Sequence, residues 1–194
     1  GIPGRVGSTP VQNVGAYGQE VADTIAAVRV WDRTLEQVRT LAADDLRFGY
    51  RDSILKAERG RLVVLDVLFQ FRLSDLGAPI RYADLADQLG VSLGERVPLA
   101  QAREAVLSQR RSRGMVLDEG DHDTWSCGSF FTNPLVPERD WPQVQERIAA
   151  RLGAEVLGGM PRWPAASVAG DPLVKLSAAW LIERAGFGKG HGLP

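Results

Sequence analysis

The sequence RLVVLDVLFQFRL, residues 61–73, predicts a long β-strand, because its apolar and β-branched residues run almost unbroken. Its length suits a strand in the middle of a sheet. Upstream, TIAAVRVW (24–31) has the same enrichment, and residues 38–41 resume it after a turn-like break, which is typical of a β-hairpin. A short helix with acidic residues is expected over residues 42–46. The first part of the chain is therefore predicted to be rich in strands.

Helical patterns dominate after Pro79, where apolar residues recur at helical spacing. The predicted helices end near glycines or arginines, as helices commonly do. They cover residues 82–89, 98–111, 140–152 and 177–185. Residues 1–19 are expected to be loop, and residues 113–134 loop with short strand. The change from strands to helices between residues 75 and 100 predicts an α+β fold with a domain boundary there.

Composition excludes several classes of function. The chain of 194 residues carries 23 basic and 24 acidic residues, without a basic block that would favour nucleic acid or an anionic membrane. Cys127 is the single cysteine, which rules out an internal disulfide and a metal site of cysteine pairs, and which suits a reducing cytoplasm. No apolar run approaches the roughly 20 residues of a membrane span. We therefore expect a cytoplasmic protein with no metal site.

The first stretch with chemical character is GIPGRVGSTPVQNVGAYG, residues 1–18. Its glycines permit left-handed or tightly packed backbone, which can bring N–H groups against a flat or anionic ligand. Ser8, Thr9, Gln12 and Asn13 add hydrogen-bonding side chains. Because neither G-x-G-x-x-G nor P-loop spacing is present, a glycine-rich structural turn is the alternative interpretation.

The second stretch, RFGYRDSILK (47–56), places two arginines, a tyrosine and a lysine shortly before the strand at 61–73. An arginine held there can bind a carboxylate through two parallel hydrogen bonds. The alternative is a solvated loop whose Tyr50 packs on the core.

The third stretch is DTWSCGSFFTNP, residues 123–134. It is not the G-x-S-x-G elbow of a hydrolase, because Phe131 stands where the second glycine should be and neither histidine has an evident triad spacing. Ser129 can still donate a proton to a carbanion that forms beside it. The alternative is a buried Phe130–Phe131 pair beside a hydrogen-bonded serine. Cys127 is interpreted as a small buried residue.

Other positions carry little information when each is taken alone. Tyr82 begins one predicted helix, while Arg110 and Arg113 lie at the end of another. Lys175 precedes the helix at 177–185, near the end where an anion can bind. Each of these residues also suits an ordinary surface position.

Taken together, these stretches resemble the UDP-N-acetylenolpyruvoylglucosamine reductase family. GIPGRVGSTPVQNVGAYG, RFGYRDSILK, RRSRGMVLD (110–118), GSFFTNP (128–134) and KLSAAWLIERAGFGKG (175–190) occur in the order of the family and cover nearly the whole chain. QNVGAYG and GSFFTNP are the most specific of them.

The resemblance implies a fold and a domain organisation. Residues 1–75 would be the later part of a FAD-binding domain of the vanillyl-alcohol oxidase type. Residues 103–194 would be a C-terminal α/β domain for the UDP-sugar, truncated at its C-terminal end. Residues 76–102 would connect the two and carry RYADL (81–85), which resembles the loop whose tyrosine folds over substrate in the first type of the family.

The resemblance also implies a reaction in two halves. NADPH reduces FAD, and the enolpyruvyl ether of UDP-N-acetylglucosamine then receives a hydride at C3 and a proton at C2, which gives UDP-N-acetylmuramate for peptidoglycan. Arg51 matches the family's arginine for the substrate carboxylate, and Ser129 matches its serine proton donor.

Further matches are implied around the cofactor and the substrate. On the flavin side they are Ser8, Thr9, Gln12, Asn13, Gly15 and Tyr17, and on the UDP side Tyr82, Arg110, Arg113, Asn133 and Lys175. Many relatives have a lysine where Arg113 stands, which retains a cation but changes the contact geometry. The expected partners are NADPH and UDP-N-acetylglucosamine enolpyruvate, and a monomer is expected.

Two parts of the family pattern are absent from this sequence: an N-terminal lobe with a glycine-rich segment for the FAD diphosphate, and a C-terminal stretch with a catalytic glutamate. We therefore expect the chain to belong to a longer protein and to bind FAD weakly by itself. Two alternatives stay open. Residues 123–134 and Lys175 argue against another FAD oxidoreductase of the vanillyl-alcohol oxidase group, and Arg51 and Ser129 argue against a non-catalytic UDP-sugar-binding module.

Overall fold

The computed structural model describes residues 4–126, 128–167, 170–188 and 191–192. Internal contacts divide the chain into two compact units, Gly1–Gly128 and Ser129–Pro194. Each unit combines helices with antiparallel sheet, which confirms the predicted α+β class.

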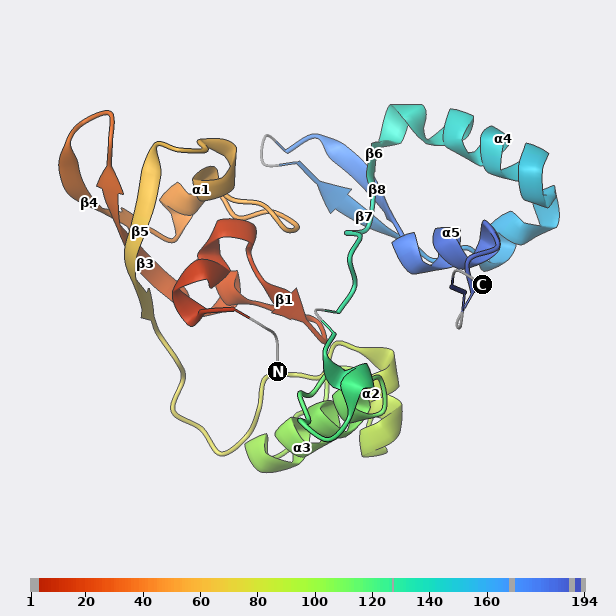
Figure 1. Cartoon of the computed structure of the whole chain (residues 1–194), viewed down its shortest axis with the longest axis horizontal. Coiled ribbons are helices and arrows are strands. Elements are labelled where there is room, and N and C mark those ends of the chain that lie inside the picture. The colour runs from red at the N-terminus through yellow and green to blue at the C-terminus, as the bar shows by residue number, and fades with distance from the viewer. Residues whose placement is uncertain (1–3, 127, 168–169, 189–190, 193–194) are drawn as a thin grey trace. The chain divides into compact units, whose positions relative to one another are not determined.

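The sheet of the first unit consists, among the described residues, of β3 (Ile25–Asp32), β4 (Gln37–Ala42) and β5 (Leu62–Phe69) in the antiparallel order β4-β3-β5 (Figure 1). The predicted hairpin is confirmed by the pairing of β3 with β4. The expectation that residues 61–73 form the middle strand is wrong, because β3 lies between the other two. The side chains of β3 include the fully buried Val28 and Val30, whereas β5 exposes several apolar residues. Apolar content alone therefore did not identify the central strand.

Short segments complete the core against this sheet. η1 (Val6–Gln12) packs against both β5 and α1 (Ile54–Ala57), and η3 (Asp44–Leu46) contributes the buried Leu46. The buried apolar side chains are Ile25, Val28, Val30, Leu41, Leu46 and Leu55. The short helix predicted over residues 42–46 is confirmed only in part, because η3 covers Asp44–Leu46 as a 3₁₀ segment and Ala42 ends β4.

The prediction that residues 1–19 form a loop is wrong in part. η1 forms there, followed by a short antiparallel ribbon of β1 (Gly15–Ala16) and β2 (Gln19–Glu20) and by η2 (Val21–Asp23). Short 3₁₀ segments and two-residue strands are too brief to show an apolar period, so no pattern in the sequence indicated them.

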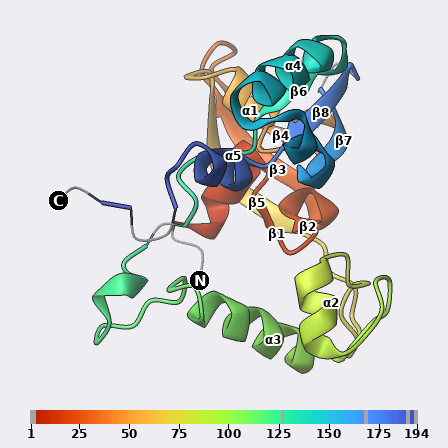
Figure 2. The same ribbon diagram turned by 90° about the vertical axis from the view of Figure 1, so that its right-hand side faces the viewer.

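A second core of the first unit is helical. α2 (Ala83–Leu89) packs against α3 (Leu99–Arg111), as Figure 2 shows, and both confirm predicted helices. Gly90 ends α2 in the left-handed conformation, with φ 67°, as the sequence predicted. The buried residues of this core are Ile80, Leu85, Ala86, Val97 and Ala105. Downstream, the predicted loop contains only the 3₁₀ turn η4 (His122–Thr124) among its described residues.

The second unit contains a sheet that the sequence did not reveal. Among the described residues, β6 (Leu135–Pro137), β7 (Arg162–Ala166) and β8 (Pro172–Leu176) pair in the antiparallel order β6-β8-β7. Each strand is short and contains a proline, which weakens a strand signal. The helices α4 (Trp141–Leu152) and α5 (Ala178–Arg184) were predicted and are confirmed. The 3₁₀ segments η5 (Glu138–Asp140) and η6 (Ala154–Gly159) flank α4.

A buried ion cluster ties β3 to the segments beside it. Asp32 is 0% exposed, and its carboxylate accepts hydrogen bonds from Arg61 Nη2 at 2.9 Å and Arg39 Nη1 at 3.1 Å. The backbone N–H groups of Thr34 and Leu35 donate to the same carboxylate. The hydrogen bond from Arg61 is the main reason that the pKa of Asp32 lies well below its usual range.

We expect Asp32→Asn to destabilise the protein and to flatten its response to acid. A carboxylate whose folded-state pKa is lowered contributes stability that is present above its unfolded pKa of about 3.9 and is lost as the pH falls towards the folded-state pKa. Thermal melts should show a loss of at least about 5 °C at neutral pH. The difference in melting temperature should shrink in acid, because the wild type then also loses the stability that the Asp32 carboxylate contributes.

Asp66→Asn is the matched control for this prediction, because Asp66 pairs with Arg29 on the same sheet but has a side chain that is 54% exposed. Exposed ion pairs contribute little, so its melting temperature should stay close to that of the wild type. Equal losses for the two variants would contradict the role assigned to the buried cluster.

Candidate functional site

Arg51 lies at the centre of a contact network in the first unit. Its backbone is left-handed, with φ 54°, and its carbonyl accepts a hydrogen bond from Lys56 Nζ at 2.7 Å. Its guanidinium donates to Asn13 O at 3.2 Å and to Gly15 O at 2.5 Å, and Nη1 lies 3.5 Å from Glu20 Oε1. Three acceptors around one planar group restrict its orientation. The loop of residues 12–20 and the segment around Arg51 thus form one unit of structure.

Asn13 organises this loop from within. It is 1% exposed and adopts a left-handed backbone with φ 43°. Its Nδ2 donates to Glu20 Oε2 at 2.7 Å and to Gly49 O at 3.0 Å, and its Oδ1 accepts from the N–H of Ala22 at 3.1 Å. The Asn13 side chain therefore holds the loop together and shapes the backbone that a ligand would meet.

Gly15 allows the close approach of this loop to Arg51. A Cβ on Gly15 would lie 2.7 Å from Gln19 O and 3.1 Å from Arg51 Nη1. We expect Gly15→Ala to open the β1–β2 ribbon and to lower the free energy of unfolding by about 1–3 kcal/mol, measured by denaturant titration. Gly7→Ala is the control, because a Cβ there meets nothing within 4 Å. A similar loss of unfolding free energy in both variants would show that the close approach at Gly15 does not require glycine.

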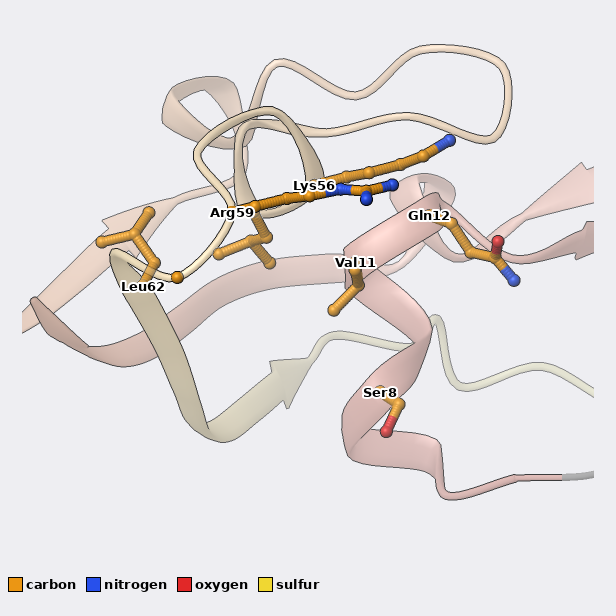
Figure 3. Close-up of a pocket in the computed structure, with 8 residues that line it drawn as sticks. Ser8, Val11, Gln12, Lys56, Arg59 and Leu62 are labelled. Carbon is orange, nitrogen blue, oxygen red and sulfur yellow. The ribbon is translucent and has the colours of Figure 1, made fainter.

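Ser8 and Gln12 line an open pocket of about 560 Å³ beside η1, together with Lys56 and Arg59 (Figure 3). The rest of the lining consists of Val11, Leu55, Gly60 and Leu62. The volume lies within the range of ligand pockets, and a hydroxyl, an amide and two cationic groups suit a polar or anionic ligand. Thr9 is engaged by its own segment, since its Oγ1 donates to Val6 O at 2.7 Å.

Three residues predicted for the site meet elsewhere in the first unit. The rings of Tyr17 and Tyr82 make an edge-to-face contact with centroids 5.5 Å apart. Arg113 lies beside Tyr82 and donates to Asp84 Oδ2 at 3.2 Å. Burial lowers the pKa of Arg113, but Tyr82 and Asp84 raise it, and the net shift is upward. One residue predicted for the flavin side thus joins two predicted for the substrate side.

The second unit brings Asn133 and Lys175 to the same sheet. Asn133 Oδ1 accepts a hydrogen bond from the N–H of Ala178 at 3.0 Å, at the start of α5. Lys175 lies on β8 opposite Leu135 of β6, and its Nζ is 5.3 Å from the centre of the Trp163 ring. Asn133 and Lys175 therefore lie near the point where β6 and β8 pair.

Ser129 begins the second unit in an exposed segment. The interpretation of Phe130 and Phe131 as a buried pair is wrong, because they are 86% and 62% exposed, although their rings contact each other edge to face. Cys127, interpreted as a small buried residue, lies outside the described residues.

Several residues with contacts in the site were not singled out from the sequence. Glu20 pairs with Arg51, Asp84 pairs with Arg113, and Lys56 and Arg59 line the pocket. Lys56 stands inside RFGYRDSILK, so its charge was the available signal, whereas nothing in the sequence marked Asp84. Arg110, predicted for the substrate side, donates to Met115 O at 3.4 Å, just beyond α3.

Two further properties concern the part of the chain that the structure describes. No group of three or more His, Cys, Asp or Glu side chains there could hold a metal ion. None of its helices is long and apolar enough to cross a membrane.

Comparison with known proteins gives a consistent result. No protein-family model matches the chain. It is 55% identical over 192 residues to the UDP-N-acetylenolpyruvoylglucosamine reductase of Thermobifida fusca, a match that covers 99% of this chain and 52% of that protein. The reductase of the same name from Streptomyces coelicolor is 53% identical over 193 residues, covering 99% and 49%. That from Mycobacterium tuberculosis is 52% identical over 194 residues, covering 98% and 50%. The chain spans about half the length of the curated relatives it matches.

Proposed function

Because this chain is homologous over nearly its whole length to curated UDP-N-acetylenolpyruvoylglucosamine reductases, we propose that it is part of such an enzyme. The reaction would be the NADPH-driven, FAD-dependent reduction of UDP-N-acetylglucosamine enolpyruvate to UDP-N-acetylmuramate. One carbon of the enolpyruvyl double bond gains a hydride and the other gains a proton. Negative charge develops next to the substrate carboxylate, so protein groups must stabilise this charge and deliver the proton.

The pocket beside η1 suits part of a flavin cofactor. Ser8 and Gln12 would hold it through hydrogen bonds, with Lys56 and Arg59 as the cationic part of the lining. Thr9, Asn13, Gly15 and Tyr17 would shape the surrounding loop. When bound, FAD supplies the hydride chemistry.

The oriented Arg51 carries the proposal. A guanidinium whose plane is fixed can bind a carboxylate through two parallel hydrogen bonds and stabilise developing charge without reorganisation. The Arg51 side chain is 26% exposed, which leaves it accessible to a ligand while it is partly shielded from water. A partly desolvated cation interacts more strongly with an anion than one in open solvent.

Ser129 would donate the proton to the carbon beside the carboxylate. A serine hydroxyl is a poor acid in water, so the transfer requires a carbanion-like centre within hydrogen-bond reach and the exclusion of water. Arg51 and Ser129 belong to different compact units.

The remaining predicted residues would bind the UDP part. Residues 103–194 would form the substrate domain, residues 1–75 the later part of the FAD domain, and residues 76–102 the connection that carries Tyr82. The groups that would contact UDP are Tyr82, Arg110, Arg113, Asn133 and Lys175. Phosphate binding by several cations is common because charge-assisted hydrogen bonds are strong.

A spectroscopic experiment on the full-length protein that contains this chain tests the proposal. The purified protein should show a flavin absorption band that shifts when UDP-N-acetylglucosamine enolpyruvate is added. UDP-N-acetylglucosamine, which lacks the carboxylate, should cause a smaller shift. The proposal fails if the protein binds no flavin, or if the two compounds cause the same response.

A further inference from the structure

Glu20 contacts two residues of the candidate site from the end of the β2 strand. We infer that Glu20 is a positioning residue, which fixes the plane of the Arg51 guanidinium for the carboxylate of the substrate. This inference rests on the proposed function, because it concerns how Arg51 meets that carboxylate.

Both carboxylate oxygens of Glu20 are engaged. Oε1 lies 3.5 Å from Arg51 Nη1, and Oε2 accepts a hydrogen bond from Asn13 Nδ2 at 2.7 Å. Asn13 is itself buried and fixed by Gly49 and Ala22. Asn13 thus fixes the orientation of the Glu20 carboxylate. The Glu20 carboxylate in turn restricts the orientation of the Arg51 guanidinium.

The backbone of Glu20 is held as well. Its N–H donates to Asp23 Oδ2 at 3.0 Å across η2, and Glu20 pairs with Gly15 in the β1–β2 ribbon. Gly15 supplies one of the two carbonyls that bind Arg51. Glu20 and the carbonyls of Asn13 and Gly15 therefore surround the guanidinium as a single assembly from one loop.

This arrangement leaves part of the guanidinium for a ligand. Within the described residues, the polar contacts of Arg51 use Nη1 twice and Nη2 once, and its guanidinium also lies 5.1 Å from the centre of the Tyr50 ring. Of its five N–H donors, the Nε–H and one N–H of Nη2 remain for a bound carboxylate. Two parallel hydrogen bonds to a carboxylate depend on the angle of the guanidinium plane. A partner that fixes this plane favours the chemical step through orientation.

The charge of Glu20 has the opposite effect on binding. A carboxylate beside Arg51 repels the carboxylate of an incoming substrate and partly neutralises the cation. Removing the charge of Glu20 should therefore not weaken substrate binding. It should, however, let the Arg51 guanidinium rotate more freely. A residue that only stabilises the loop would instead affect binding and rate together.

The test compares Glu20→Gln with Glu36→Gln in the full-length protein. Glu36→Gln is the matched control, because it makes the same change at an exposed glutamate in the turn between β3 and β4. With Glu20→Gln, the rate constant for reoxidation of the reduced protein by UDP-N-acetylglucosamine enolpyruvate should fall about 10-fold or more. The dissociation constant of the same compound, measured by calorimetry on the oxidised protein, should stay unchanged or decrease. Glu36→Gln should change neither quantity by more than about 2-fold.

A second readout is independent of activity. In the full-length protein, ¹⁵N NMR of the Arg51 side chain, assigned with Arg51→Lys, reports how fast its guanidinium rotates. Rotation should be slow in the wild type and in Glu36→Gln, and clearly faster in Glu20→Gln.

The outcomes separate the two claims. A slower reaction with retained binding and a faster guanidinium rotation in Glu20→Gln support the inference. An unchanged rate, a parallel loss of rate and affinity, or unchanged rotation overturns it. If the wild-type protein is not reoxidised by the compound at all, the proposed function fails, while the NMR comparison still decides whether Glu20 orients Arg51.

Discussion

Ser129→Ala, made in the full-length protein that contains this chain, is expected to leave reduction by NADPH nearly intact and to slow reoxidation by the enolpyruvyl substrate by a factor of about 10²–10⁴. The two half-reactions separate because only the second needs a proton at carbon. Alanine removes the hydroxyl and adds no bulk, so substrate binding should change little. Rapid-mixing absorbance at the flavin band under anaerobic conditions measures each half-reaction by itself.

Ser126→Ala is the matched control for this variant. Ser126 is an exposed serine in the same stretch, and its Oγ accepts a hydrogen bond from the N–H of Gly128 at 3.1 Å. It has no assigned role in the chemistry, so both half-reactions should stay close to those of the wild type. If Ser129→Ala slowed both half-reactions equally, the assignment of Ser129 as proton donor would be wrong.

Arg51→Ala is expected to slow the same second half-reaction by a factor of about 10²–10³, because it removes the charge that stabilises the developing anion. Arg51→Lys should recover only part of the rate, since lysine keeps the charge but cannot form two parallel hydrogen bonds from a fixed plane. The measurement is again the rate of reoxidation, with saturating substrate so that weaker binding is separated from slower chemistry.

Arg47→Ala provides the control for Arg51, because it is an exposed arginine of the same segment that also has a left-handed backbone, with φ 47°. Its replacement should not affect either half-reaction. Near-normal reoxidation by Arg51→Ala would remove Arg51 from the catalytic machinery, and with it the basis for the role of Glu20.

The fold could be predicted where the chain has regular periods. The hairpin of β3 and β4 and the helices α2, α3, α4 and α5 all follow apolar patterns with clear end signals, such as Gly90 after α2. η1 and the proline-containing strands of the second unit were not predicted, because each is too short for a pattern. The position of β5 depends on which strands pair, and this is a property of the whole sheet.

For the candidate site, the sequence supplied a hypothesis about positions, and it contained no signal for the contacts among them. Arg51 and Tyr82 were chosen by resemblance, and the sequence contains no sign that Arg51 meets Asn13, Gly15 and Glu20 across more than 30 residues of chain. Such contacts depend on the left-handed backbone of Asn13 and Arg51. A left-handed backbone at a residue other than glycine is uncommon, so it is difficult to predict from sequence. The ring contact of Tyr17 with Tyr82 is likewise a result of tertiary packing.

A single turnover of the full-length protein tests the central claim most directly. The protein is reduced with NADPH under anaerobic conditions and mixed with UDP-N-acetylglucosamine enolpyruvate, and both the flavin band and the product mass are followed. The account predicts that the oxidised flavin band returns and that the sugar nucleotide gains two hydrogens to become UDP-N-acetylmuramate. A flavin that stays reduced beside unchanged sugar nucleotide would contradict it.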